Sequence, residues 1–165
     1  MMVDAFIQDI SKIAQENIEK DDYLQPMAFI IKEGEIVPMS LSNTDDEAKF
    51  RSYTDVGLVA QKLAADKVIL LADVAARIVD NPEDAKYVQE NYSTESPLSY
   101  PESLRLDGIL FLVVELKSGT ATGYFRRYEK HEIGYKFHEL ETYSETFSGG
   151  LVNMVMGGFN FDLEN

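Results

Sequence analysis

The chain contains no cysteine. Disulfide bonds, thiolate zinc sites, iron–sulfur clusters and cysteine nucleophiles are therefore excluded, because each requires a cysteine sulfur. The sequence has only two histidines, His131 and His138, which lie seven residues apart across a predicted turn. This spacing differs from the i, i+4 pair with which a helix binds zinc. We therefore predict no metal site and no cofactor.

Long apolar segments and an excess of positive charge are also missing. The longest strictly apolar run covers residues 109–114, whereas a membrane-spanning helix needs ~20 apolar residues. The first residues have neither the basic region nor the apolar core of a signal peptide. With 29 acidic against 15 basic side chains the net charge is -14, which repels phosphate polymers and anionic lipids. We expect a cytoplasmic protein that binds neither membranes nor nucleic acid directly.

What is present is enough apolar material for one core. The chain has 165 residues, of which 45% are hydrophobic, a size and composition typical of one folded domain. We predict a single α+β domain over residues 1–165. Its sheet is expected to be mixed and mostly antiparallel, with about six strands, an N-terminal helix, a crossover helix and a short C-terminal helix.

The first half of the sequence alternates between helical and strand patterns. Apolar residues at three- and four-residue steps predict a helix over 3–20. Residues 27–41 read as a hairpin turning at Gly34, with Pro38 placing the second strand at a sheet edge. Thr44 and Glu47 form a capping box that opens a second helix. That helix leads to an apolar strand at 67–75, and a crossover of this kind predicts that part of the sheet is parallel.

The second half is mainly β in character. Residues 83–90 are predicted as a short helix, 91–103 as a long loop and 106–143 as a three-stranded meander. The spacing of apolar residues over 151–159 predicts a short helix with Ser148 as its cap, and 161–165 is expected to be a frayed tail. We find no internal repeat.

The segment 123–139 combines both histidines, two adjacent arginines and three tyrosines. A hairpin that places Arg126 beside Phe137 directs Arg126 and Arg127 to opposite faces. One face would then carry Tyr124, Arg126, Tyr128, Tyr135, Phe137 and Glu139. Tyr and Arg are enriched in binding interfaces, which indicates a contact surface for a protein or a ligand. An ordinary half-exposed sheet, or a face covered by a helix, explains the same pattern.

A catalytic alternative rests on Glu115 and Lys117 at the end of a strand. They match half of a metal-dependent nuclease motif, in which carboxylates hold the cation and lysine stabilises negative charge. The motif also needs an aspartate, and Asp73 on the other buried strand is the only suitable residue. The plainer interpretation of Asp73 is a structural ion pair with Arg77 or Lys117.

Three functional hypotheses follow. The first is a non-catalytic module that binds a protein partner, a small ligand or a second copy of itself, through the Tyr/Arg-rich face or an open sheet edge. The second is the metal-dependent hydrolase with Glu115, Lys117 and Asp73. The third is an acidic mimic of nucleic acid, which requires carboxylates spaced along one face like phosphates. The absence of a complete catalytic motif favours the first.

Overall fold

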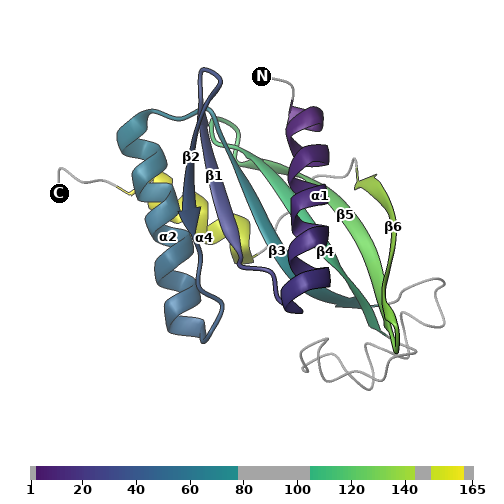
Figure 1. Cartoon of the computed structure of the whole chain (residues 1–165). Helices are drawn as coiled ribbons and strands as arrows, with labels where there is room; N and C mark the ends of the chain where they lie inside the picture. The colour runs from purple at the N-terminus through teal and green to yellow at the C-terminus, as the bar shows by residue number, and fades with distance from the viewer. Residues whose placement is uncertain (1–2, 78–104, 144–149, 162–165) are drawn as a thin grey trace, which may run out of the picture.

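The computed structural model describes residues 3–77, 105–143 and 150–161, and it confirms the predicted α+β domain. One six-stranded sheet has the order β2-β1-β3-β4-β5-β6. Helix α1 packs on one face of the sheet, and helices α2 and α4 pack together on the other (Figure 1). The helices and strands are α1 (Val3–Asp21), β1 (Met27–Lys32), β2 (Glu35–Ser40), α2 (Asp46–Leu63), β3 (Lys67–Arg77), β4 (Arg105–Glu115), β5 (Thr120–His131), β6 (Gly134–Tyr143) and α4 (Gly150–Phe159).

The sheet differs from the prediction in strand direction. All five strand pairs in the described ranges are antiparallel, so the expected parallel portion is wrong. The crossover through α2 does join two strands of the same direction, β2 and β3. However, β1 lies between them, because β3 pairs with the inner strand of the first hairpin and not with its outer strand.

Pro38 marks the edge of the sheet, as its sequence position predicts. The β1–β2 hairpin turns through Glu33 and Gly34, which have φ angles of 50° and 84°, as a two-residue turn with positive φ at both positions requires. Hydrogen-bonded and non-hydrogen-bonded pairs alternate outward from such a turn, so Pro38 opposite Phe29 falls in a non-hydrogen-bonded pair. The Pro38 nitrogen therefore points to the open edge, where proline removes a donor that another strand would use.

Strands β3 and β4 form the centre of the molecule. Alternate residues point to opposite faces, so each strand supplies both cores. The side under α2 and α4 buries Ala28, Ile30, Val68, Leu70, Leu112 and Val114. The side under α1 buries Ile31, Ile69, Leu71, Ile109, Phe111 and Val113. Ile109 and Phe111 on the α1 side and Val114 on the other side are all 0% exposed, so β4 is covered on both faces.

Helices α2 and α4 contact each other through their backbones. A Cβ atom added to Gly57 would lie 2.0 Å from the carbonyl oxygen of Val155, and one added to Gly158 would lie 2.1 Å from the carbonyl oxygen of Thr54. Contacts this short admit only glycine. The two helices therefore form a tightly closed layer over their face of the sheet.

The helix ends agree with the sequence to within a few residues, but the predicted cap of α2 is wrong. Asp45, and not Thr44, is the N-cap: its Oδ1 accepts a hydrogen bond of 2.7 Å from the Ala48 backbone N–H. Thr44 instead shares a hydrogen bond with the Ser42 hydroxyl. An aspartate at this position also interacts favourably with the helix dipole, which a threonine does not.

Some predictions lie outside the described residues. They are the short helix at 83–90, the loop at 91–103, the cap at Ser148 and the tail beyond Phe161. No helix within the described ranges is both long enough and apolar enough to cross a membrane.

Candidate functional site

The β5–β6 hairpin contains the residues that the sequence singles out. It closes at His131 opposite Gly134, and Gly134 has a φ angle of 121°. Near this turn Tyr128 lies opposite Phe137. Farther along, the register shifts, and Arg126 lies opposite Leu140. The predicted pairing of Arg126 with Phe137 is therefore wrong.

The shift is a β-bulge on β6. Both His138 and Glu139 lie against the single residue Arg127, so β6 carries one extra residue at this point. An extra residue changes the side-chain alternation beyond it, and Leu140 takes the position opposite Arg126 that was predicted for Phe137. Leu140 packs with the apolar cluster under α1, whereas Glu139 is exposed. Glu139 therefore does not belong to the predicted face.

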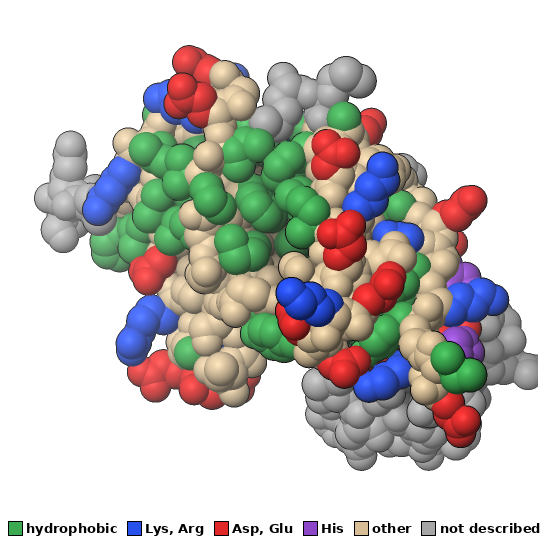
Figure 2. Space-filling view, in the orientation of Figure 1, with side chains coloured by type: hydrophobic (Ala, Val, Ile, Leu, Met, Phe, Trp, Pro, Cys, Tyr) green, Lys and Arg blue, Asp and Glu red, His purple; other side chains and the backbone are tan. Residues whose placement is uncertain are grey.

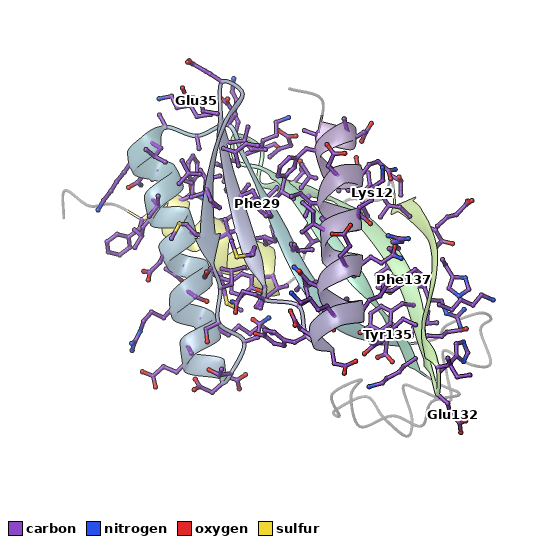
Figure 3. All side chains as sticks on the ribbon, in the orientation of Figure 1. Lys12, Phe29, Glu35, Glu132, Tyr135 and Phe137 are labelled. Carbon is purple, nitrogen blue, oxygen red and sulfur yellow. The ribbon has the colours of Figure 1, made fainter. Side chains whose placement is uncertain are left out.

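The remaining five residues of the predicted face do lie on the side of the sheet that carries α1. Tyr124, Tyr128, Tyr135 and Phe137 pack against the apolar cluster beneath that helix, and Arg126 contacts the helix directly. Figure 3 shows Tyr135 and Phe137 projecting from β6 toward α1. Most of this face is thus occupied by the protein's own helix.

Hydrogen bonds at both ends of α1 hold the helix against strands β5 and β6. The carboxylates that accept them belong to Asp4 in the first turn and to Asp22, directly after the helix. The Tyr124 hydroxyl donates to Asp4 Oδ1 at 2.9 Å. At the other end of the helix the Tyr135 hydroxyl donates to Asp22, and Lys130 Nζ lies 3.5 Å from the same carboxylate. The Tyr135 hydrogen bond, followed by the Lys130 charge, lowers the pKa of Asp22.

Three rings fill the space between these hydrogen bonds. The Tyr128 ring centroid lies 5.4 Å from that of Phe137 and 5.8 Å from that of Tyr135. The guanidinium carbon of Arg126 lies 5.1 Å from the centroid of the Phe137 ring, within the range of a cation–π contact. The guanidinium and the ring are therefore in contact, although Phe137 is not the strand partner of Arg126.

Arg126 is half-buried and is held by neutral groups. Its Nε donates to the carbonyl oxygen of His138 at 2.9 Å, and its Nη1 donates to Oγ of Ser11 at 3.2 Å and to the Ser11 carbonyl oxygen at 3.5 Å. Among the described residues, no carboxylate lies within ion-pair distance of this guanidinium. Withdrawal from water lowers the pKa of Arg126, and the charge of Glu19 opposes this effect. The side chain remains a cation, since arginine does not lose its proton in proteins.

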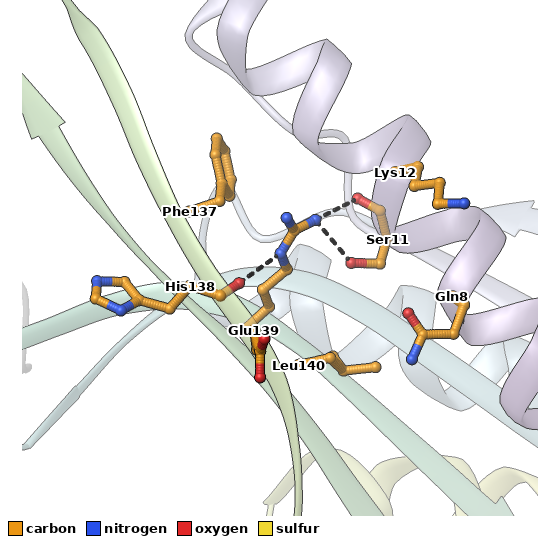
Figure 4. Close-up of a pocket in the computed structure, with 8 residues that line it drawn as sticks. Gln8, Ser11, Lys12, Phe137, His138, Glu139 and Leu140 are labelled. Atoms are coloured by element: carbon orange, nitrogen blue, oxygen red, sulfur yellow. Dashed lines mark hydrogen bonds between the residues drawn. The ribbon is translucent and has the colours of Figure 1, made fainter.

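A cleft of about 590 Å³ opens beside this guanidinium, between α1 and the β5–β6 hairpin (Figure 4). Its walls come from Gln8, Ser11 and Lys12 on the helix and from Arg126, Phe137, His138, Glu139 and Leu140 on the sheet. His138 contributes its backbone carbonyl, whereas its ring points away from the helix. The cleft thus combines a central cation with apolar and polar walls.

Glu129 on β5 connects the two histidines, a contact that sequence spacing did not reveal. His131 Nε2 lies 3.5 Å from one oxygen of Glu129, and His138 Nε2 lies 3.7 Å from the other. Glu129 is the neighbour of Tyr128 on β5 and points to the opposite face of the strand, so it is not part of the Tyr/Arg-rich face. In residues 3–77, 105–143 and 150–161, no group of three or more acidic and histidine side chains is arranged to hold a metal ion.

The three residues of the hydrolase alternative do not converge. Glu115 lies opposite Lys67 on β3 and forms an ion pair with it at 3.4 Å, whereas Asp73 lies opposite Ile109. Asp73 and Lys67 are six positions apart on one strand, which separates Asp73 from Glu115 by about 20 Å. A single cation cannot contact both carboxylates.

Asp73 instead accepts a hydrogen bond of 2.7 Å from the Tyr128 hydroxyl. The predicted partner Lys117 is exposed in the turn after β4, and the Arg77 side chain is outside the described part of the structure. Partial desolvation raises the pKa of Asp73, although some of its side chain still contacts solvent; the Tyr128 hydrogen bond opposes the rise and the charge of Asp107 adds to it. A tyrosine partner was not predicted, because Tyr128 is 55 residues away in sequence.

Comparison of this chain with models of protein families, with curated proteins and with solved structures finds no match.

Proposed function

We propose that this protein is a non-catalytic binding module, and that its ligand or protein partner binds in the cleft between α1 and the β5–β6 hairpin. The observation that carries the proposal is Arg126. A half-buried guanidinium that is held by neutral oxygens, and that has no carboxylate partner among the described residues, keeps its charge available to a bound molecule.

The proposal narrows the surface predicted from sequence. Tyr124 and Tyr135 hold the ends of α1, so a partner cannot use their hydroxyl groups without displacing the helix. Arg126 and Phe137 are the two residues of the Tyr/Arg-rich face that line this cleft. A concave site with a few convergent polar groups and apolar walls is the usual form of a ligand site.

The separation of Asp73 from Glu115 supports a binding role over hydrolysis by those residues. The acidic-mimic hypothesis stays a prediction, and it rests on the net charge of -14. Neither alternative gives a role to the Arg126 cleft.

Occlusion of the cleft tests the proposal. Gln8 is exposed on α1 and lines the cleft, so Gln8→Trp fills it with an indole while leaving the core unchanged. Asn17 is exposed on the same helix and does not line the cleft, which makes Asn17→Trp the matched control. A chemically diverse set of small molecules and peptides is screened by ¹H–¹⁵N NMR against all three proteins.

We expect at least one compound to shift the signals of Arg126, Phe137 and Leu140 in the wild type and in Asn17→Trp, but not in Gln8→Trp. Compounds that shift signals equally in Gln8→Trp bind elsewhere. If every binder behaves in this way, the cleft is not the binding site.

A second candidate function, self-association, is favoured by a different surface. Hydrophobic side chains gather over β1 and β2, between α1 and α2, where no helix covers them (Figure 2). They include Met27, Phe29 and Ile36, all partly exposed, and Phe6 of α1 places its ring against Phe29 at a centroid distance of 5.2 Å. Because Pro38 weakens the edge of β2 as a pairing strand, association would use this face and not the strand edge.

Ile36→Lys tests this surface, with Val37→Lys as control because neighbouring strand residues point to opposite faces. If the chain forms dimers, light scattering should give a monomer mass for Ile36→Lys and a dimer mass for Val37→Lys. A wild type that is monomeric at millimolar concentration removes this candidate.

A further inference from the structure

Resting on the proposed function, we infer that the molecule bound in the cleft carries a carboxylate next to an apolar or aromatic group. The carboxylate accepts hydrogen bonds from the Arg126 guanidinium, and the apolar group lies against Phe137 and Leu140. The inference follows from the donors that Arg126 leaves unused, from the balance of charges around the cleft, and from its walls.

The hydrogen bonds of Arg126 leave one nitrogen unused. Nε and Nη1 donate to His138 and Ser11, whereas Nη2 makes no hydrogen bond to any residue in the described ranges. Its two N–H groups are therefore unused donors on a residue that lines the cleft. Guanidinium N–H groups match carboxylate oxygens in geometry, and such charge-assisted bonds are about twice as strong as neutral ones. The contacts with His138 and Ser11 hold the guanidinium in place before a ligand arrives.

The charges around the cleft favour a single negative charge over a double one. Arg126 and Lys12 are the cations that line it, and Glu139 is the one anion. Glu19 is near enough to influence Arg126, and the whole chain has a net charge of -14. A phosphate dianion would meet this repulsion twice over, while a carboxylate leaves the local balance close to neutral.

The apolar side chains in the walls of the cleft favour a ligand that also carries an apolar group. The Phe137 ring lies beneath the guanidinium, and the Leu140 side chain lies on the same face directly across from Arg126. A ligand that satisfies Arg126 therefore brings its neighbouring atoms against these two side chains. Burial of that apolar surface adds to the binding free energy, and an inorganic anion, which has no apolar part, lacks this contribution.

Two sources supply this chemistry: a free organic acid, and the C-terminal carboxylate of a peptide with an apolar last residue. The probes that separate them are 3-phenylpropionate and an N-acetylated tetrapeptide ending in phenylalanine. Their controls are 3-phenylpropionamide and the same tetrapeptide with a C-terminal amide. Inorganic phosphate tests for a general anion site. Affinities are measured by ¹H–¹⁵N NMR titration at low ionic strength.

We expect the two carboxylates to bind at least about tenfold more tightly than their amides, as the loss of a charged hydrogen bond implies, and phosphate to bind more weakly still. The tighter of the two carboxylate probes identifies the source. Amides that bind as tightly as the acids, phosphate that binds as tightly as 3-phenylpropionate, or no binding of either carboxylate probe would overturn the inference.

Variants then assign the binding to the cleft. Arg126→Gln should weaken binding of the acids by at least about tenfold and leave the amides unchanged. Because Arg126 also holds α1, that variant requires an NMR check of its fold. Lys12→Gln, at an exposed residue, avoids this problem and should weaken the acids by about two- to fivefold through its charge alone. Lys20→Gln, exposed on the same helix outside the cleft, is the control for net charge.

The outcome also separates this inference from the proposed function. If the diverse screen finds cleft binders that are lost in Gln8→Trp but are neutral or cationic, the module still binds ligands and only the carboxylate assignment fails. If Lys20→Gln weakens the acids as much as Lys12→Gln does, binding follows net charge and the assignment to Arg126 also fails.

Discussion

The two faces of the central sheet are covered in different ways. Helices α2 and α4 pack backbone against backbone through Gly57 and Gly158 and close their face with a continuous apolar layer. Helix α1 is held on its face partly by long tyrosine and arginine side chains of β5. These side chains extend from the strand and form hydrogen bonds with residues of the helix. Long polar side chains leave space between them, and the cleft lies in that space. A face closed by glycine contacts stabilises the fold, whereas a face held by polar side chains can also bind a ligand.

The largest expected effect breaks the closed face. Gly158→Ala places a methyl group 2.1 Å from the Thr54 carbonyl oxygen, so α4 must move away from α2. We expect a loss of about 3 kcal/mol or more in the free energy of unfolding, measured by urea denaturation.

Gly157→Ala is the matched control, because a Cβ at this neighbouring position meets nothing within 4 Å. Greater helix propensity should make it neutral or stabilising by up to about 1 kcal/mol. Equal destabilisation by both substitutions would mean that the close contact of α2 with α4 is absent in solution.

On the other face, single contacts should matter less. Tyr128→Phe removes the hydroxyl that donates to Asp73 while keeping the ring among Tyr135 and Phe137. We expect a loss of about 1 kcal/mol, again measured by urea denaturation. Tyr124→Phe, which removes the more exposed hydrogen bond to Asp4, should cost less. The reverse order would show that the helix margin, and not the Tyr128–Asp73 contact, dominates this face.

The carboxylate of Asp73 should make the free energy of unfolding depend slightly on pH. Partial desolvation raises the folded-state pKa of Asp73 above its ordinary value, so the folded state binds this proton more tightly than the unfolded state does. This contribution stabilises the protein at low pH and is lost as the pH rises from the unfolded pKa through the folded pKa. Asp73→Asn should therefore stabilise the protein at neutral pH, by less than about 1 kcal/mol because solvent screens this carboxylate. The advantage should shrink toward pH 3; a constant difference across this range would contradict the assigned shift.

The contribution of Asp22 to stability should depend on pH in the opposite direction, and its effect should be the smallest of those considered. The folded-state pKa of Asp22 is lowered by the Tyr135 hydrogen bond and by Lys130. The contribution is thus present above the unfolded pKa and is lost as the pH falls through the folded pKa. Asp22→Asn should be slightly destabilising at neutral pH and neutral in strong acid, as followed by thermal unfolding across pH. Stabilisation by Asp22→Asn at neutral pH would show that this carboxylate is not held by its partners.

Local patterns predicted much of the fold. The second-half meander was predicted from its strand-like runs, and the missing donor of Pro38 located β2 at an edge. The opposite directions of Arg126 and Arg127 also follow from the period of a strand: Arg126 contacts α1, while Arg127 pairs with Glu129 outside that contact. These features depend only on residues close in sequence.

Register and long-range packing were not predictable in the same way. The turn after β4 spans residues 116–119 and moves the β4–β5 register by two positions from a two-residue hairpin, so Val114 faces Ala121. An even shift leaves every side chain on its predicted face. The bulge on β6 is an odd shift, which is why Glu139 leaves the predicted face. The contacts of Tyr128 with Asp73 and of Gly57 with α4 join segments that are far apart in sequence. Local sequence patterns cannot predict such contacts.

The most direct test of the account is the side-chain Nε resonance of Arg126, followed by NMR as 3-phenylpropionate is added. A carboxylate bound at this guanidinium predicts a saturable shift of that resonance, which 3-phenylpropionamide does not produce and which Gln8→Trp abolishes. A resonance that stays fixed through saturating acid, or that moves equally with the amide, would contradict the claim that the space beneath α1 is a binding site for a carboxylate.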